Sequence, residues 1–212
     1  LLNAEKVLAA LKHDSANARN IHAVTGNYLK GLSDKTAPTV SSIGGDWLVL
    51  GLTRSSKDVP AGYFDNVAAY VKKNINASGQ LNANKSTENS RVILALTAAG
   101  FDPQNVGGYN LLNGLNDMDF VKKQGINGPI WALIALDSHN YGIPAGTASN
   151  PTTRDKLVTA ILEAQLPDDG WAYSGTVADS DMTGMALQAL APYYKLGTND
   201  ALTSAVNKAI EK

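Results

Sequence analysis

Two acids at the start of an apolar segment are the residues best suited to chemistry. Asp179 and Asp181 stand in the run Asp179-Ser180-Asp181-Met182-Thr183, directly before a stretch rich in Ala and Leu. A carboxyl group can act as a general acid or base when its surroundings adjust its pKa. Carboxylates at the start of a helix also accept hydrogen bonds from the first N–H groups and favour the helix dipole. The pattern favours helix capping and leaves catalysis as the alternative.

A second pair of acids, Asp168 and Asp169, precedes Gly170. Paired carboxyl groups hydrolyse glycosides when the distance between them suits the reaction, but adjacency in the sequence does not set that distance. Neighbouring acids before a Gly are typical of turns. We therefore predict a turn here, beside which Tyr173 is placed to contact a ligand.

Metal and thiol chemistry is not expected. The chain has no Cys, which excludes disulfides, a thiolate nucleophile and Cys-ligated zinc. Its three His residues, His13, His22 and His139, are scattered, and none belongs to a metal-ligand spacing. The sequence predicts neither a metal site nor a cofactor.

Charge and hydropathy restrict the classes of partner that the chain is expected to bind. The net charge of -1 and the pI near 6.3 provide no attraction for nucleic acid or for an anionic membrane. No run approaches the ~20 apolar residues of a membrane span. We expect no nucleic-acid partner and no membrane span. Because Leu1 is not a natural start, we also interpret the chain as a processed or excised fragment from which any signal or anchor has been removed.

Two kinds of predicted helix alternate along the chain, and no stretch has the alternation typical of a strand. Amphipathic helices with one apolar stripe are expected to lie outside, and segments that are apolar nearly all round are expected to lie inside. Two further helices are predicted over 4–12 and 21–32. The outer helices are predicted over 61–75, 118–123, 153–165 and 200–210, and the inner ones over 43–55, 86–100, 125–140 and 179–194.

Local signals indicate where the inner helices begin and end. Asp46 is well placed near the start of the first, and Ser86 or Thr87 offers a side-chain cap for the second. Pro129 lies near the first turn of the third, where its missing N–H costs nothing. Pro192 is expected to break the fourth.

The inner helices are versions of one another. Each carries a short Leu-rich core that ends at Leu52, Leu96, Leu136 or Leu190, so that the copies are 44, 40 and 54 residues apart. A repeat of this length, made of one amphipathic and one apolar helix, is typical of stacked helical hairpins. We predict a single all-α domain over 1–212.

A turn joins an outer to an inner helix in the best-preserved copy. Gln165, Gly170 and Trp171 form a Gln-x4-Gly-Trp pattern, in which the Gln amide can bond free backbone groups at the helix ends while the Trp ring covers it. Weaker versions occur at Asn74, Gly79 and Leu81 and at Gly107, Gly108 and Tyr109.

This combination resembles the QW-type repeats of squalene-hopene cyclases and the wider group of terpenoid cyclase and protein prenyltransferase toroids. The resemblance extends from about residue 42 onward and is strongest over 157–194. It implies an α/α toroid, a barrel of inner helices wrapped by outer ones. With four or five hairpins, both a complete and an incomplete ring stay open. The chain also resembles the prenyltransferase-like repeat domains of bacterial surface proteins and, distantly, the cobalamin carriers intrinsic factor and transcobalamin.

The resemblance to the cyclases implies a role for Asp181. In that family an Asp-x-Asp-Asp-Thr motif protonates an alkene through its middle Asp, which matches Asp181, while Asp179 matches the first. This chain departs from the motif at the next residue, because Met182 stands where the cyclases have a helper acid. Protein prenyltransferases bind zinc through an Asp, Cys and His set, which a chain without Cys does not provide.

Aligned positions of the inner helices are expected to ring one mouth of the barrel. Counted from the repeated leucines, the ring holds polar, cationic and large apolar groups, a mixture that suits a ligand of mixed character or a packed centre. Arg91 on an apolar helix needs a partner, and Glu88 lies one turn earlier. The positions are Thr87, Asn127 and Asp181 in one tier, and Trp47, Arg91, Trp131 and Met185 in the next.

Three functions remain open from the sequence. The favoured one is a binding domain of a secreted or cell-surface bacterial protein, which takes an unidentified small molecule or protein at the barrel mouth. The second is a terpenoid-cyclase-like enzyme with Asp181 as its general acid. The third is a structural spacer whose barrel is filled by its own side chains.

Overall fold

The computed structural model describes residues 23–40 and 43–211, and all regular structure in these ranges is helical. Two isolated β-bridges also occur there, Val106 with Tyr109 and Asp117 with Pro151. The helix predicted over 21–32 is present over 23–33. The helix predicted over 4–12 lies outside the described residues.

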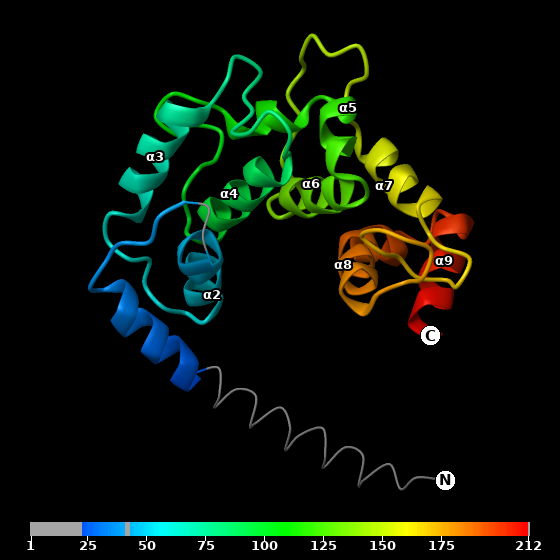
Figure 1. The fold of residues 1–212 in the computed structure, drawn as a ribbon, viewed down its shortest axis with the longest axis horizontal. Helices are drawn as coiled ribbons and strands as arrows, with labels where there is room; N and C mark the ends of the chain where they lie inside the picture. The colour runs from blue at the N-terminus through cyan, green and yellow to red at the C-terminus, as the bar shows by residue number, and fades with distance from the viewer. Residues whose placement is uncertain (1–22, 41–42, 212) are drawn as a thin grey trace, which may run out of the picture.

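Four helical segments form an inner row, in the order predicted from the repeat. The first begins as the short segment η1, Ile43–Trp47, and continues as α2, Leu48–Arg54. The row continues with α4, Thr87–Ala98, α6, Asn127–Asp137, and α8, Ser180–Leu196. Successive members pack together, α2 against α4, α4 against α6 and α6 against α8. Figure 1 shows this row as an arc, with α2 and α8 at its two ends.

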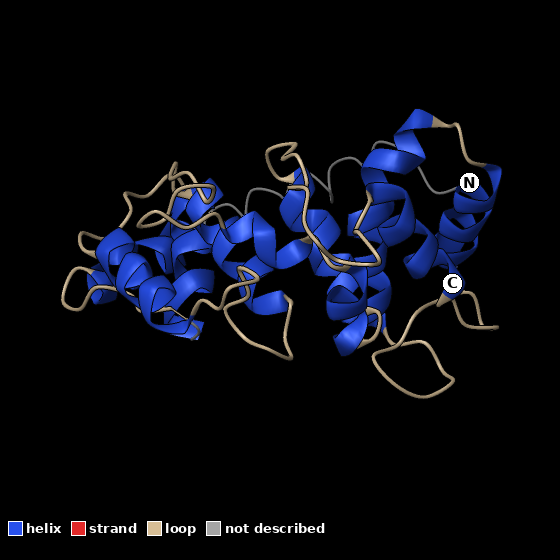
Figure 2. Cartoon of the chain, turned by 90° about the horizontal axis from the view of Figure 1, so that it is seen from above, coloured by secondary structure: helices blue, strands red, loops and turns tan. Residues whose placement is uncertain are grey.

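The outer helices alternate with the inner ones. They are α3, Tyr63–Asn74, the short α5, Met118–Val121, with η3, Lys122–Gln124, then α7, Arg154–Glu163, and α9, Asp200–Glu211. α5 and α7 pack on α6, and α9 packs on α8. A 3-10 segment, η2, Leu111–Leu115, interrupts the connection from α4 to α5. Figure 2 shows the helices joined by long loops along both edges.

The core lies between the inner and outer helices. Its largest fully buried side chains include Trp171, Tyr63, Ile93, Ile130 and Leu133. Burying one such aliphatic side chain stabilises a fold by about 1.5–3 kcal/mol. The apolar character of α4 and α6 is therefore explained by packing on two sides, against their neighbours in the row and against the outer layer.

The turn before α8 is held by Trp171 and Gln165. The Trp171 ring is buried, and its Nε1–H donates to the carbonyl oxygen of Ile161 in α7 at 2.7 Å. The Gln165 amide donates to the carbonyls of Asp169 and Ala205, both at 2.9 Å. Thus Trp171, rather than Gln165, bonds a carbonyl near the end of α7, which also accepts from the backbone N–H of Ala164 at 3.3 Å. Gln165 ties the turn to α9.

Two predictions about helix ends are wrong, the side-chain cap at the start of α4 and the break at Pro192 in α8. Ser86 has helical dihedral angles and makes no side-chain cap; its hydroxyl donates to the Val121 carbonyl at 3.3 Å instead. The N–H of Thr87 is satisfied from another part of the chain, because it donates to Oε1 of Gln124 at 3.1 Å.

Pro192 lies inside α8 and does not break it. A proline within a helix leaves the carbonyl four residues earlier without its usual donor. That residue is Gln188, which is exposed, as is Pro192, so water can replace the missing N–H. The helix therefore continues to Leu196, beyond the end predicted at 194.

Candidate functional site on the open face of the inner row

One stripe along each inner helix is less buried than the rest. On α4, Val92, Ile93 and Leu96 are fully buried, whereas Thr87 and Arg91 remain partly exposed. These open positions are three or four residues apart, the spacing of a single helix face. α6 repeats the pattern with Asn127, Trp131 and Ile134, and α8 repeats it with Asp181, Met185 and Gln188. The positions predicted to ring a barrel mouth thus lie on the open stripes of the inner row.

An aromatic pair bridges two of these stripes. The ring centroids of Trp47 and Trp131 are 5.2 Å apart, with their planes tilted by 57°. Trp47 precedes α2 and Trp131 belongs to α6, while α4 packs between these two helices. The two rings therefore meet across α4. Since 37% of Trp47 is exposed, the pair offers an aromatic surface to a partner.

An ionic cluster lies beside the aromatic pair. The Arg91 guanidinium donates to both oxygens of Glu88, at 3.0 and 2.7 Å, and through Nε to Oδ2 of Asp46 at 2.9 Å. The Arg91 and Glu88 side chains are 13% and 15% exposed, and that of Asp46 is fully buried. The predicted partnership of Arg91 with Glu88 is confirmed. We call Asp46, Glu88, Arg91, Trp47 and Trp131 the open-face cluster.

The cluster is anchored to the outer layer through Asp46. The buried hydroxyl of Tyr63, in α3, donates to Oδ1 of Asp46 at 2.7 Å. Burial raises the pKa of Tyr63, and the Asp46 carboxylate raises it further. Burial alone would lower the pKa of Arg91, but the hydrogen bonds that Arg91 donates to Glu88 and Asp46, together with their negative charge, outweigh burial and raise it. Arg91 is therefore a fixed cation, held in place by two carboxylates.

The acids of the 179–183 run have different surroundings. Asp179 is the N-cap of α8, since its carboxylate accepts from the N–H of Met182 at 2.7 Å and from that of Tyr173 at 3.2 Å. Asp181 lies exposed in the first turn, and Met182 is buried. Tyr173, in the preceding loop, is 66% exposed. Thr183 bonds the backbone of Trp171.

A hollow of about 370 Å³ lies at the start of α8. Asp179, Ser180, Thr183, Gly184 and Leu187 contribute to its lining, and Asp181 does not. Asp181, the acid that matches the protonating Asp of the cyclase motif, therefore stands outside this hollow, while Asp179 lines it.

The second pair of acids serves the turn before α8. An oxygen of Asp168 accepts from the N–H of Ala178 at 3.0 Å. Asp169 has a positive φ of 67°, a conformation that Asp tolerates in turns, and its carboxylate lies 3.8 Å from Nζ of Lys208. The turn predicted for this pair is confirmed.

The sequence interpretation did not assign to the site either Asp46, a member of the open-face cluster, or Tyr63, which donates to Asp46 from α3. Asp46 was expected only to favour a helix start. A signal was present, because Asp46 directly precedes Trp47, which aligns with Arg91 in the repeat. A buried carboxylate requires a partner, and the aligned arginine was the nearest candidate.

A comparison of the chain with protein families, curated proteins and solved structures finds no match. Among the residues that the structure describes, there is no group of three or more His, Cys, Asp or Glu side chains arranged to hold a metal ion. No helix in the described ranges is long and apolar enough to cross a membrane.

Proposed function

We propose that this chain is a binding domain of the α/α toroid type, from a secreted or cell-surface bacterial protein, that holds its partner on the open face of the inner row. The Trp47–Trp131 pair is the observation that carries the proposal. The toroid assignment and the location rest on the resemblance to prenyltransferase-like repeat domains. The arc of alternating inner and outer helices is compatible with part of such a ring.

The open-face cluster has the composition of a binding hot spot. Trp and Arg are enriched among residues that dominate binding energies, especially where they are rigidly held. Here the two rings support each other, and Arg91 is fixed by Glu88 and Asp46. Such a surface suits a small molecule with a flat apolar part, or a protein that places an apolar side chain on the rings.

The cyclase alternative gains no support from the surroundings of Asp181. Protonation of an alkene requires a strongly acidic group in an enclosed, aromatic pocket that stabilises a cation. Asp181 is exposed, and its neighbour is Met182 rather than a second acid. We therefore propose no enzymatic activity, and product formation from squalene would contradict this part of the proposal.

The test is capture of a partner by the intact chain and by a cluster variant. Wild-type protein, Trp47→Ala/Trp131→Ala and Tyr109→Ala are incubated with extract of the host organism and analysed by native mass spectrometry for bound molecules. Tyr109 is a matched control because its exposed fraction, 39%, is similar to the 37% of Trp47 and because it lies outside the open-face cluster.

A molecule retained by wild type and Tyr109→Ala, but lost from the double variant, supports the proposal. Equal retention by all three proteins would refute binding at this face. No retained molecule with any of them, in extracts that contain the rest of the host's proteins and metabolites, would favour the structural spacer.

A further inference from the structure

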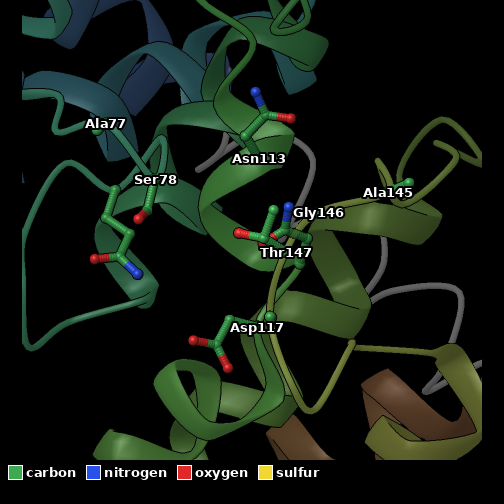
Figure 3. A pocket seen from close by; sticks show the side chains of 10 residues that line it. Ala77, Ser78, Asn113, Asp117, Ala145, Gly146 and Thr147 are labelled. Atoms are coloured by element: carbon green, nitrogen blue, oxygen red, sulfur yellow. The ribbon is translucent and has the colours of Figure 1, made fainter.

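A separate polar hollow lies among three loops, away from the open-face cluster. It has a volume of about 330 Å³ and is shown in Figure 3. One wall is the turn after α3, another is the segment from η2 to the start of α5, and the third is the loop between α6 and α7. We call it the loop pocket; it is lined by Ala77, Ser78, Gln80, Asn113, Asn116, Asp117, Ala145, Gly146, Thr147 and Ala148.

The first wall is a closed turn. Oδ1 of Asn76 accepts from the N–H groups of Ser78 and Gln80, at 3.0 and 2.9 Å, while the backbone N–H of Asn76 donates to the Gln80 carbonyl at 3.0 Å. The buried Asn89 fastens this turn to the second wall, because its amide donates to the carbonyls of Gly79 and Leu111. These bonds fix the wall before any ligand arrives.

Close backbone approaches fix the other walls. A Cβ on Gly79 would fall 2.6 Å from Cβ of Asn113, and a Cβ on Gly146 would fall 2.4 Å from Nδ2 of Asn116. Only glycine allows these approaches, so the three loops stand at set distances. The backbone of Asn116 and Asp117 also pairs with the chain after the third loop, through the N–H of Thr152 and the bridge to Pro151.

Several polar groups in the pocket retain unused hydrogen-bonding capacity. The side chains of Asn113, Asn116 and Thr147 make no hydrogen bond within the part of the chain that the structure describes. Gln80 uses its Oε1 to accept from Asn76 at 3.0 Å, and its Nε2 stays available. Oδ1 of Asp117 accepts from two N–H groups as the N-cap of α5. Figure 3 shows Ser78 on one side of the hollow, with Thr147 and Asp117 on the other.

The lining selects a class of ligand. It contains no Lys, Arg or His, and its one ionisable group is the Asp117 carboxylate, so an anion is disfavoured. A calcium ion takes six to eight oxygens and usually more than one carboxylate. Neutral amides and hydroxyls both donate and accept, which matches a ligand with several hydroxyl groups. The volume is at the small end of the range for ligand sites.

We propose that the loop pocket binds one ring of a carbohydrate. The amides of Gln80, Asn113 and Asn116 and the hydroxyl of Thr147 bond the ring hydroxyls. The methyl groups of Ala77, Ala145 and Ala148 contact the C–H face of the ring. With no aromatic ring among the lining residues and a single sugar unit bound, the Kd is in the millimolar range for a free monosaccharide.

This site is independent of the proposed partner at the open-face cluster. The two share no residue, so failure of one leaves the other intact.

The experiment follows amide chemical shifts of the full chain by NMR during titration with glucose, galactose, mannose and N-acetylglucosamine. We expect saturable shifts in the loop pocket with at least one sugar, and none at Trp47 or Trp131. Asn113→Ala keeps the Cβ that packs on Gly79, and Thr147→Val keeps the shape of an exposed side chain. Each is expected to weaken binding about 3- to 10-fold, the effect of one lost hydrogen bond.

Asn82→Ala is the matched control, since Asn82 is an exposed amide just outside the pocket. It should bind as the wild type does. The proposal is overturned if none of the four sugars gives saturable shifts in the pocket, if the two pocket variants bind as tightly as the control, or if calcium chloride or a short neutral peptide produces the pocket shifts and the sugars do not.

Discussion

Asp46 joins three elements, and its removal should be among the most destabilising single changes in the chain. It accepts hydrogen bonds from Tyr63 in α3 and from Arg91 in α4, and its side chain is fully buried. Asp46→Ala leaves the buried Tyr63 hydroxyl without this acceptor, which costs about 1–3 kcal/mol. It also removes one charged bond to Arg91, worth about 1.5–3 kcal/mol.

The two contributions sum to a loss of about 2.5–6 kcal/mol in the free energy of unfolding. No larger penalty is added for Arg91, because it keeps both bonds to Glu88 and is not left as an isolated buried charge. A loss of this size is a large fraction of the ~5–15 kcal/mol that stabilises a typical domain. Urea denaturation followed by circular dichroism measures it. Asp58→Ala, at an exposed acid 12 positions later, should change stability by less than about 0.5 kcal/mol.

A double-mutant cycle tests the cause. In wild type, Tyr63→Phe removes a donor from the Asp46 carboxylate and should be destabilising. In the Asp46→Ala background, the same change removes a hydroxyl that has already lost this acceptor, so it should cost little or even stabilise. Additive effects of the two substitutions would refute the reasoning, as would an Asp46→Ala variant within about 0.5 kcal/mol of wild type.

Three further predictions concern the turn, the cap and pH. Trp171→Phe should lower the free energy of unfolding by about 1–3 kcal/mol, since it removes the indole hydrogen bond to the Ile161 carbonyl and leaves a void; urea denaturation would show it, and a change below about 0.5 kcal/mol would contradict it. Asp179→Ala should cost about 1 kcal/mol as a lost N-cap, whereas Asp181→Ala should stay within about 0.5 kcal/mol; thermal melts of both variants that coincide would contradict the difference. Burial and the neighbouring Asp46 raise the pKa of Tyr63, so the unfolded chain releases this proton at lower pH than the folded chain does. The contribution of Tyr63 to the free energy of unfolding should therefore be fully present below about pH 10 and decrease as pH rises further. The urea midpoint should fall less steeply with pH in Tyr63→Phe than in wild type, and equal slopes above about pH 10 would contradict this.

The order and type of the helices follow from local pattern alone. The inner helices are apolar nearly all round because they are packed on two sides, and the Leu-rich cores repeat because each hairpin solves the same packing problem. This is why the alternation of inner and outer helices was predictable in 43–211. The exact ends of the helices were less predictable. Ser86 does not cap its helix, since it has helical dihedral angles and its hydroxyl donates to the Val121 carbonyl in a distant segment.

The candidate site was predictable in its positions and not in its contacts. Arg91 and Glu88 are one turn apart, so their pairing follows from helix geometry. The meeting of Trp47 with Trp131 depends on how closely three helices pack and on the tilt of two rings, which repeat alignment does not specify. The loop pocket was missed for a similar reason, because its walls come from three separate connections.

The position of α6 in the row has a consequence for how the molecule opens. It has α4 and α8 on its two sides and α5, η3 and α7 packed on it, whereas α2 and α9 stand at the ends of the succession. In a structure whose packing is mainly between neighbours, each end can detach without disturbing the other. Amide hydrogen exchange should accordingly be slowest in α6 and become faster toward both ends. The molecule would then unfold progressively from its ends rather than in one cooperative transition.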